Sequence, residues 1–247
     1  MSRLRPFSFA IFLILLLGLP SPQPGFTAQG SDIHLLSPGE GSLVTSPIQL
    51  TAEIAPGSIS MVRAVLIDRS GITLARQLLR VDQNPDEDTF GFKTLIPFDI
   101  PETTVEAMLT LSVLDEYYRP IALRSVIITL QSDGDPSFQM PRPDISWLML
   151  TEPKPLLSYS GGEIQVGGTI IPLTQEPVVI ELITSEWRVV GSSQLPVNQP
   201  NQPLEFDLSL PYSRIESLTN ARLVLRQAAD PYESDAVLDS LVITLLP

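Results

Sequence analysis

Side chains that could carry catalytic chemistry are scarce in this chain of 247 residues. It has a single histidine, His34, and no cysteine. A Ser-His-Asp or Cys-His arrangement needs an imidazole base, and a typical zinc site needs several His and Cys ligands. His34 stands beside Ile33 and Leu35 in an apolar stretch, so we interpret it as an ordinary strand residue. We predict no enzyme activity, no catalytic residue, no metal site and no cofactor.

An acidic loop, "DQNPDED", is the one segment whose spacing suggests a metal ligand set. Its oxygen-bearing side chains fall at alternate positions, as at the start of an EF-hand loop: Asp82, Asn84, Asp86 and Asp88. The match then fails, because Glu87 stands where that loop needs Gly and Lys93 where it needs Glu. We expect a solvated acidic loop without tight calcium binding, and the sequence leaves weaker binding open.

Tyrosines mark two segments that we expect to be hairpin turns. Tyr117 and Tyr118 lie in "DEYYRP", and Tyr232 lies in "DPYESD". A tyrosine at a loop tip can stack on a sugar or anchor a partner chain. These three residues are our candidate binding site, with the alternative that each ring lies back over the edge of its own sandwich.

The segments around these turns alternate between apolar and polar residues. In "IQLTAEI" (48–54) and "LEFDLSL" (204–210) every second residue is apolar. Period two with one polar face is typical of a half-buried antiparallel strand. Helical spacing is nearly absent, and only Ser213–Leu218 could form a turn of helix.

The chain repeats this strand pattern. "SVIITL" at 125–130 returns as "SLVITL" at 240–245, which is 115 positions later. Seven short strands per hundred or so residues, with turn signals between them, predict an immunoglobulin-like sandwich. We therefore predict an all-β chain with two tandem immunoglobulin-like antiparallel β-sandwiches at 32–131 and 144–247. The Pro-rich segment 132–143 is the expected semi-rigid linker, and we expect each sandwich to fold independently.

The alternation also predicts which side chains are buried. We expect four leucines of the penultimate strands in the cores: Leu109, Leu111, Leu223 and Leu225. Four neighbours on the opposite strand face should be exposed and tolerate alanine, unless a partner covers that face: Met108, Thr110, Arg222 and Val224. We expect core packing for both Trp147 and Trp187.

The N-terminal 28 residues are expected to direct export. Arg3 and Arg5 precede an apolar run at 7–19, which is too short to span a bilayer but fits the core of a signal peptide. We predict a signal peptide at 1–28, with an uncleaved segment and peripheral membrane association as the alternative. No cysteine follows the run, which excludes a lipoprotein anchor.

The chain is acidic, with a formal net charge of −13 and a pI near 4.4. Removal of Arg3 and Arg5 with the signal would change −13 to −15. Such a surface repels nucleic acid and anionic lipid, so we predict no nucleic-acid partner. Solubility outside the cell explains the acidity, and low-affinity cation binding is the alternative.

The segment "IHLLSPGEGSLVTSPIQLTAEI" (33–54), followed by "VRAVLIDRSGITLAR" (62–76), resembles the immunoglobulin-like domain of bacterial sporulation, germination and envelope proteins. The resemblance covers 33–130 and, more loosely, 145–245, where "EPKPL" replaces "SPGEG". Its motifs consist of turn residues and strand boundaries, and they include no catalytic residue. The resemblance implies an extracellular module.

These observations predict a non-catalytic, exported protein that acts as a structural or protein-binding module at the bacterial cell envelope. Its partner would be another envelope or extracellular protein. The alternative is a carbohydrate-binding accessory protein that holds a surface polysaccharide with its loop tyrosines.

Overall fold

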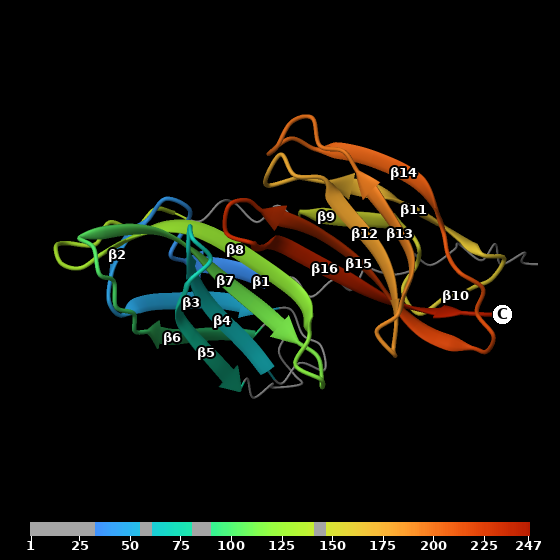
Figure 1. Cartoon of the computed structure of the whole chain (residues 1–247), viewed down its shortest axis with the longest axis horizontal. Coiled ribbons are helices and arrows are strands. Elements are labelled where there is room, and N and C mark those ends of the chain that lie inside the picture. Colours follow the sequence, from blue (N-terminus) through green and yellow to red (C-terminus); the bar gives the residue numbers. More distant parts are fainter. Residues whose placement is uncertain (1–32, 55–60, 81–89, 141–146) are drawn as a thin grey trace, which may run out of the picture.

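The structure is a computed structural model that describes residues 33–54, 61–80, 90–140 and 147–247 (Figure 1). These residues form strands and turns only, which confirms the all-β prediction. The turn of helix considered for 213–218 is not formed. Within the described ranges there is no helix with the length and apolar character needed to cross a membrane. The signal segment and the acidic loop at 82–88 lie outside the described residues.

The first sandwich packs a three-stranded sheet, in the order β1-β3-β6, against a sheet in the order β5-β4-β7-β8. A short strand, β2, adds parallel to the end of β8. The strand bounds are β1 (Ile33–Ser37), β2 (Leu43–Thr45), β3 (Ile48–Ile54), β4 (Met61–Asp68), β5 (Thr73–Arg80), β6 (Phe90–Ile96), β7 (Thr104–Leu114) and β8 (Pro120–Gln131).

The second sandwich repeats this arrangement with the sheets β14-β11-β9 and β13-β12-β15-β16. Here β10 adds parallel to the end of β16, as β2 does to β8. The bounds are β9 (Leu148–Glu152), β10 (Ser158–Tyr159), β11 (Glu163–Ile170), β12 (Val178–Thr184), β13 (Val189–Leu195), β14 (Leu204–Pro211), β15 (Thr219–Ala229) and β16 (Ser234–Leu245).

Each sandwich has its own apolar core, built by the alternation seen in the sequence. In β3 the four apolar residues predicted to point inward are buried: Ile48, Leu50, Ala52 and Ile54. The four leucines predicted for the penultimate strands are also buried, Leu109 and Leu111 in the first core and Leu223 and Leu225 in the second. Burial of one strand face against the facing sheet therefore explains why these segments form strands.

The two sandwiches share one sheet. Strand β16 pairs antiparallel with β8, so the four-stranded sheets join into a continuous sheet of ten strands when β2 and β10 are included. Figure 1 shows β8 and β16 side by side where the two sandwiches meet. Leu123 pairs with Leu238, and Arg124 pairs with Val237. Leu123 and Leu238 are 115 positions apart, the spacing of the sequence repeat, so the junction has an approximate two-fold relation.

The outer face of the shared sheet is covered near the junction, which corrects one prediction. Met108, Thr110 and Val224 were expected to be exposed, but all three are buried. Val224 packs with Leu123 and Leu238 across the junction, and Met108 packs with Tyr232 and Ala236 of the second sandwich. Strand alternation identified the correct face, but it carried no information about the neighbouring sandwich that covers this face.

Tyr232 fastens the second sandwich to the first. Its ring is only 2% exposed, and its hydroxyl donates a hydrogen bond to Glu106 Oε1 at 2.8 Å. Glu106 also lies 3.4 Å from Arg69 Nε. The prediction of Tyr232 as a loop-tip binding residue is therefore corrected, because the turn that carries it docks on the other sandwich.

A buried polar group crosses the same junction. Asp239 Oδ2 accepts hydrogen bonds from Arg124 Nη2 at 2.9 Å and from the indole nitrogen of Trp147 at 2.7 Å. Trp147 is 3% exposed, which confirms its predicted place in a core. The Arg124 guanidinium also lies 5.6 Å from the Trp147 ring. One carboxylate thus joins a strand of the first sandwich to two segments of the second.

The described part of the linker packs against the first sandwich. Ser137 and Leu43 exchange two backbone hydrogen bonds, each 2.8 Å long. Gly39 allows the linker to approach, because a Cβ there would lie 2.6 Å from the carbonyl oxygen of Gln139. The predicted domain boundaries and the independent folding of the two halves stay predictions.

Candidate functional site

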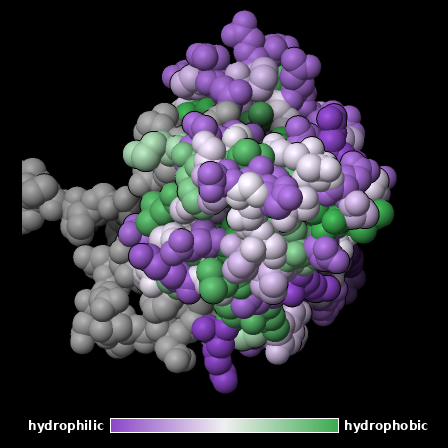
Figure 2. Space-filling model, turned by 90° about the vertical axis from the view of Figure 1, so that its left-hand side faces the viewer, coloured by the Kyte–Doolittle hydropathy of each residue, from purple (hydrophilic) through white to green (hydrophobic). Residues whose placement is uncertain are grey.

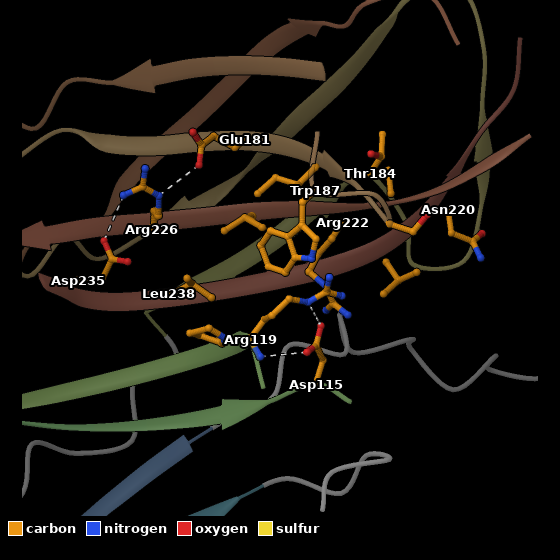
Figure 3. Close-up of a pocket in the computed structure, with 16 residues that line it drawn as sticks. Asp115, Arg119, Glu181, Thr184, Trp187, Asn220, Arg222, Arg226, Asp235 and Leu238 are labelled. Carbon is orange, nitrogen blue, oxygen red and sulfur yellow. Dashed lines mark hydrogen bonds and ion pairs between the residues drawn. The ribbon is translucent and has the colours of Figure 1, made fainter. Parts of the chain in front are cut away.

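A pocket lies on the outer face of the shared sheet, at the junction of the two sandwiches (Figure 3). Its volume is about 320 Å³, within the range of small ligand sites. The first sandwich contributes the turn after β7, and the second contributes β12, β15, β16 and the turn after β12. The lining residues used below are Asp115, Arg119, Glu181, Trp187, Arg222, Val224, Arg226, Asp235, Leu238 and Val242.

The turn between β7 and β8 forms one wall, and Asp115 holds its shape. Asp115 Oδ1 accepts backbone hydrogen bonds from Tyr117 at 2.8 Å and from Arg119 at 3.0 Å. Asp115 Oδ2 accepts a hydrogen bond from Arg119 Nε and forms an ion pair with it. Tyr118 closes the turn with a φ of 63°, in the left-handed region. The sequence "DEYYRP" therefore fixes Arg119 by contacts within its own turn.

Arg119 links two exposed aromatic rings across the junction. Its guanidinium carbon lies 4.5 Å from the centroid of the Tyr117 ring and 3.9 Å from that of Trp187. Both distances are typical of cation–π contacts. Tyr117 is 64% exposed and Trp187 is 52% exposed. We name Tyr117, Arg119 and Trp187 the aromatic ladder.

The position of Trp187 corrects a further prediction. It was expected in a core, but it lies in the turn between β12 and β13, where its φ is 64°. The corresponding turn of the first sandwich, between β4 and β5, has Gly71 with a φ of 81°. A Cβ at Gly71 would lie 3.7 Å from the carboxylate of Glu233, in the hairpin that carries Tyr232. Each turn therefore lies against the hairpin of the other sandwich. Only the turn of the second sandwich carries a large aromatic side chain, Trp187.

One end of the pocket is cationic. Arg222 on β15 donates from Nη1 to the hydroxyl of Ser240 at 2.9 Å. Ser240 in turn donates to the backbone oxygen of Ile121 at 2.6 Å, so this chain of hydrogen bonds reaches the first sandwich. Burial lowers the pKa of Arg222, the nearby Asp115 carboxylate opposes this shift, and Arg119 adds to it. The guanidinium is therefore partly desolvated and only partly compensated by negative charge.

The other end of the pocket holds one cation, Arg226, between two carboxylates. Arg226 Nε lies 3.2 Å from Glu181 Oε2, and Arg226 Nη1 lies 3.3 Å from Asp235 Oδ1. Burial raises the pKa of Asp235, and the Arg226 guanidinium opposes that shift. Figure 3 shows Arg226 between these two carboxylates, with Leu238 between this group and Arg119.

Of the three predicted site tyrosines, the structure places Tyr117 and Tyr118 on the exposed turn beside the pocket, and it buries Tyr232. The sequence interpretation missed Arg119, Trp187, Arg222 and Arg226. A signal for Trp187 was present, because "TSEW" separates two alternating stretches and so marks a turn. Neither the segment of Arg222 nor the turn of Trp187 indicates by itself that the two residues line one pocket. In the described parts of the chain, no group of three or more His, Asp or Glu side chains is placed to hold a metal ion.

The surface at the end of the first sandwich differs from this site. Figure 2 shows the end of the first sandwich, where hydrophilic and hydrophobic residues are interspersed. Exposed apolar side chains that stand singly are normal on a soluble protein. The aromatic ladder is distinguished from them by its place on the rim of a pocket.

Comparisons with known proteins identify no family for this chain. No model of a protein family matches the chain, and no curated protein matches it. Among solved structures, it is similar to the fibronectin(III)-like modules of Clostridium thermocellum CbhA, at 10% identity and a TM-score of 0.26 over 87% of this chain and 94% of that one. It is similar to a chimeric titin tandem, at 13% identity and a TM-score of 0.25 over 87% and 98%. It is also similar to a chain of the complex between Dpr2 Ig1-Ig2 and DIP-Theta Ig1-Ig3, at 10% identity and a TM-score of 0.25 over 87% and 98%.

Proposed function

We propose that the protein is an exported, non-catalytic binding module of the bacterial cell envelope, and that it recognises another envelope or extracellular protein at the junction of its two sandwiches. The observation that carries this proposal is the aromatic ladder, which places two exposed rings and an arginine beside a pocket. Tyr, Trp and Arg are the residues most often found to dominate binding energy in protein interfaces.

The junction supports this proposal because it holds the site in one geometry. The pocket has walls from both sandwiches, and these are joined by β8–β16 pairing, by the Asp239 hydrogen bonds and by Tyr232. A surface that is ordered before binding loses less conformational entropy when the partner arrives. The export part of the proposal rests on the basic and apolar N-terminal segment described above.

Site-specific photocrosslinking tests the proposal. A photoreactive amino acid replaces Tyr117 in the full chain, and the protein is incubated with the envelope fraction of its own bacterium. A matched control carries the same group at Leu78, an exposed position on β5. We expect a discrete crosslinked protein from position 117 that is lost when Trp187→Ala is added. Equal crosslinking from both positions, or none from position 117, would contradict the proposal.

A carbohydrate-binding role is the second candidate, and the exposure of Tyr117 and Trp187 is the observation that favours it. Aromatic side chains stack on sugar rings through their faces. Arg119 lies over one face of the Tyr117 ring and one face of the Trp187 ring, so a sugar would stack on the opposite faces. A glycan array with the intact protein tests this role. Binding of a surface polysaccharide that disappears in the Tyr117→Ala, Tyr118→Ala double variant would favour this role over protein recognition.

A further inference from the structure

We propose that the junction pocket binds the carboxylate of a polypeptide C-terminus, with Arg222 as the cation and with the last side chain of the peptide over the apolar floor. This inference rests on the proposed binding function of the same site and names the chemistry of its ligand. It assigns a role to a charged side chain that the folding of the chain leaves incompletely paired.

Arg222 has N–H donors that no described residue of the protein accepts. A guanidinium carries five N–H groups, and the one protein acceptor that Arg222 reaches among the described residues is the Ser240 hydroxyl. No carboxylate of the described residues lies within 4.0 Å of its nitrogens. Asp115 is the nearby counter-charge, but its two oxygens already accept three hydrogen bonds within its own turn. A ligand anion would therefore meet free donors in a partly desolvated site.

The charges at the cationic end of the pocket favour a ligand with a single negative charge, while the pocket as a whole is neutral, with three arginines and three carboxylates. Arg119 and Arg222 face one carboxylate, Asp115, at the cationic end, while Glu181 and Asp235 share Arg226 at the other end. A doubly charged phosphate would find one uncompensated cation, and it would also be repelled by a chain with a net charge of −13. A carboxylate matches the one excess positive charge, and the planar fork of an arginine binds it through two hydrogen bonds.

The floor of the pocket selects the body of the ligand. Three apolar residues line the pocket: Val224 lies between Arg222 and Arg226 on β15, Leu238 is opposite Arg226 on β16, and Val242 is opposite Arg222. Trp187 lies beside Arg119 (Figure 3). Hydrocarbon side chains gain free energy on such a floor, whereas a sugar acid would bury hydroxyl groups against it without partners. The C-terminal residue of a polypeptide combines one carboxylate with an adjacent apolar side chain, and we therefore favour it over a uronic acid.

Isothermal titration calorimetry on the intact protein tests the inference with three probes. These are an acetylated tripeptide that ends in leucine with a free carboxylate, the same tripeptide with a C-terminal amide, and glucuronate. We expect the acid to bind in the millimolar range or tighter. The amide should bind at least about tenfold more weakly, which corresponds to ~1.4 kcal/mol. Because both peptides meet the same folded protein, this contrast does not depend on how a variant folds.

Three variants then assign the contact. Arg222→Gln keeps a donor for Ser240 but removes the charge, and it should weaken the acid about tenfold while the amide changes little. Arg76→Gln, an exposed arginine on β5, is the charge-matched control and should bind both peptides as the parent protein does. Trp187→Ala removes an exposed ring and should weaken both peptides alike.

Three results would overturn the inference: equal affinity for acid and amide, acid binding that is insensitive to Arg222→Gln, or no heat of binding with either peptide at millimolar concentration. Tighter binding of glucuronate than of the peptide acid would replace the peptide C-terminus by a sugar acid. The proposed function fails separately, because crosslinking from position 117 reports any protein partner, whatever group enters the pocket.

Discussion

Leu123 and Leu238 lie opposite each other where β8 pairs with β16, and they occupy equivalent positions in the two halves of the chain. Both are buried, and both pack against Val224. A chain that repeats a fold has thus joined its two copies through the same strand of each. The contact covers part of two sheet edges, which would otherwise present unpaired backbone groups to other chains.

Truncation of Leu238 should destabilise the junction. Leu238→Ala removes a buried side chain that touches both sandwiches, and such changes cost about 2 to 5 kcal/mol. We expect the melting transition to shift down and to divide into two, because the sandwiches lose part of their shared contact. Differential scanning calorimetry measures this. Leu78→Ala on the exposed side of β5 is the control and should change stability by less than about 0.5 kcal/mol. A single transition at the parent temperature would contradict the expectation.

The outer face of β7 should be sensitive to substitution. Thr110 is 2% exposed, and its hydroxyl lies 3.0 Å from that of Ser125. Thr110→Ala leaves Ser125 without this partner and should cost about 1 to 3 kcal/mol. Leu111→Ala, on the core face, should cost about 2 to 5 kcal/mol. Urea unfolding of both variants compares the two faces. A loss below about 0.5 kcal/mol for Thr110→Ala would mean that the second sandwich does not cover this strand in solution.

Two substitutions of Asp239 should separate the contribution of its charge to stability from that of its hydrogen bonds. Asp239→Ala leaves Arg124 and the Trp147 indole without their shared acceptor and should cost about 3 to 5 kcal/mol, as is usual when one partner of a buried pair is removed. Asp239→Asn keeps an acceptor oxygen, so its cost should be smaller. Unfolding followed by tryptophan fluorescence measures both variants. The same loss for both would show that the charge, and not the hydrogen bond to Trp147, holds this group together.

Much of the fold could be predicted from the sequence because burial follows alternation. Leu109, Leu111, Leu223 and Leu225 each have polar or differently facing neighbours in a strand, and one sheet face decides their position. Val224 and Thr110 could not be placed in this way, since their surroundings come from residues more than ten positions away in the chain. Long-range pairing of β8 with β16 leaves no local pattern.

The candidate site was predicted only in part, for the same reason. Tyr117 and Tyr118 were found because paired tyrosines in a turn are conspicuous, and their exposure follows from the turn itself. Tyr232 lies in an equivalent turn but is buried, because its hairpin meets β7 of the other sandwich. Arg222 was assigned to an exposed strand face, and its pocket exists only where the turn of Tyr117 lies over that face.

The junction should weaken at alkaline pH through Tyr232. Burial, together with the hydrogen bond to Glu106, raises the pKa of its phenol well above the usual 10.0. The fold favours the neutral phenol, so this stability is complete below about pH 10 and is lost as pH rises through the folded-state pKa. Tyr232→Phe should cost about 1 kcal/mol at neutral pH, since Glu106 can turn to water, and should make stability fall less steeply above pH 10. Urea midpoints across this range measure the slope, and parallel slopes would contradict the assignment.

Residue-resolved amide hydrogen exchange at the junction tests most directly the claim that the two sandwiches form one continuous sheet. The backbone amides of Leu123, Arg124, Val237 and Leu238 are the probes. Each points either toward the neighbouring strand of its own sandwich or across the junction toward the strand of the other sandwich. We predict that all four exchange slowly, at rates like those of central β7 amides such as Leu109. If the amides that point across the junction exchange as fast as those on the open edge of β5, the shared sheet does not persist in solution and the junction pocket does not exist as described.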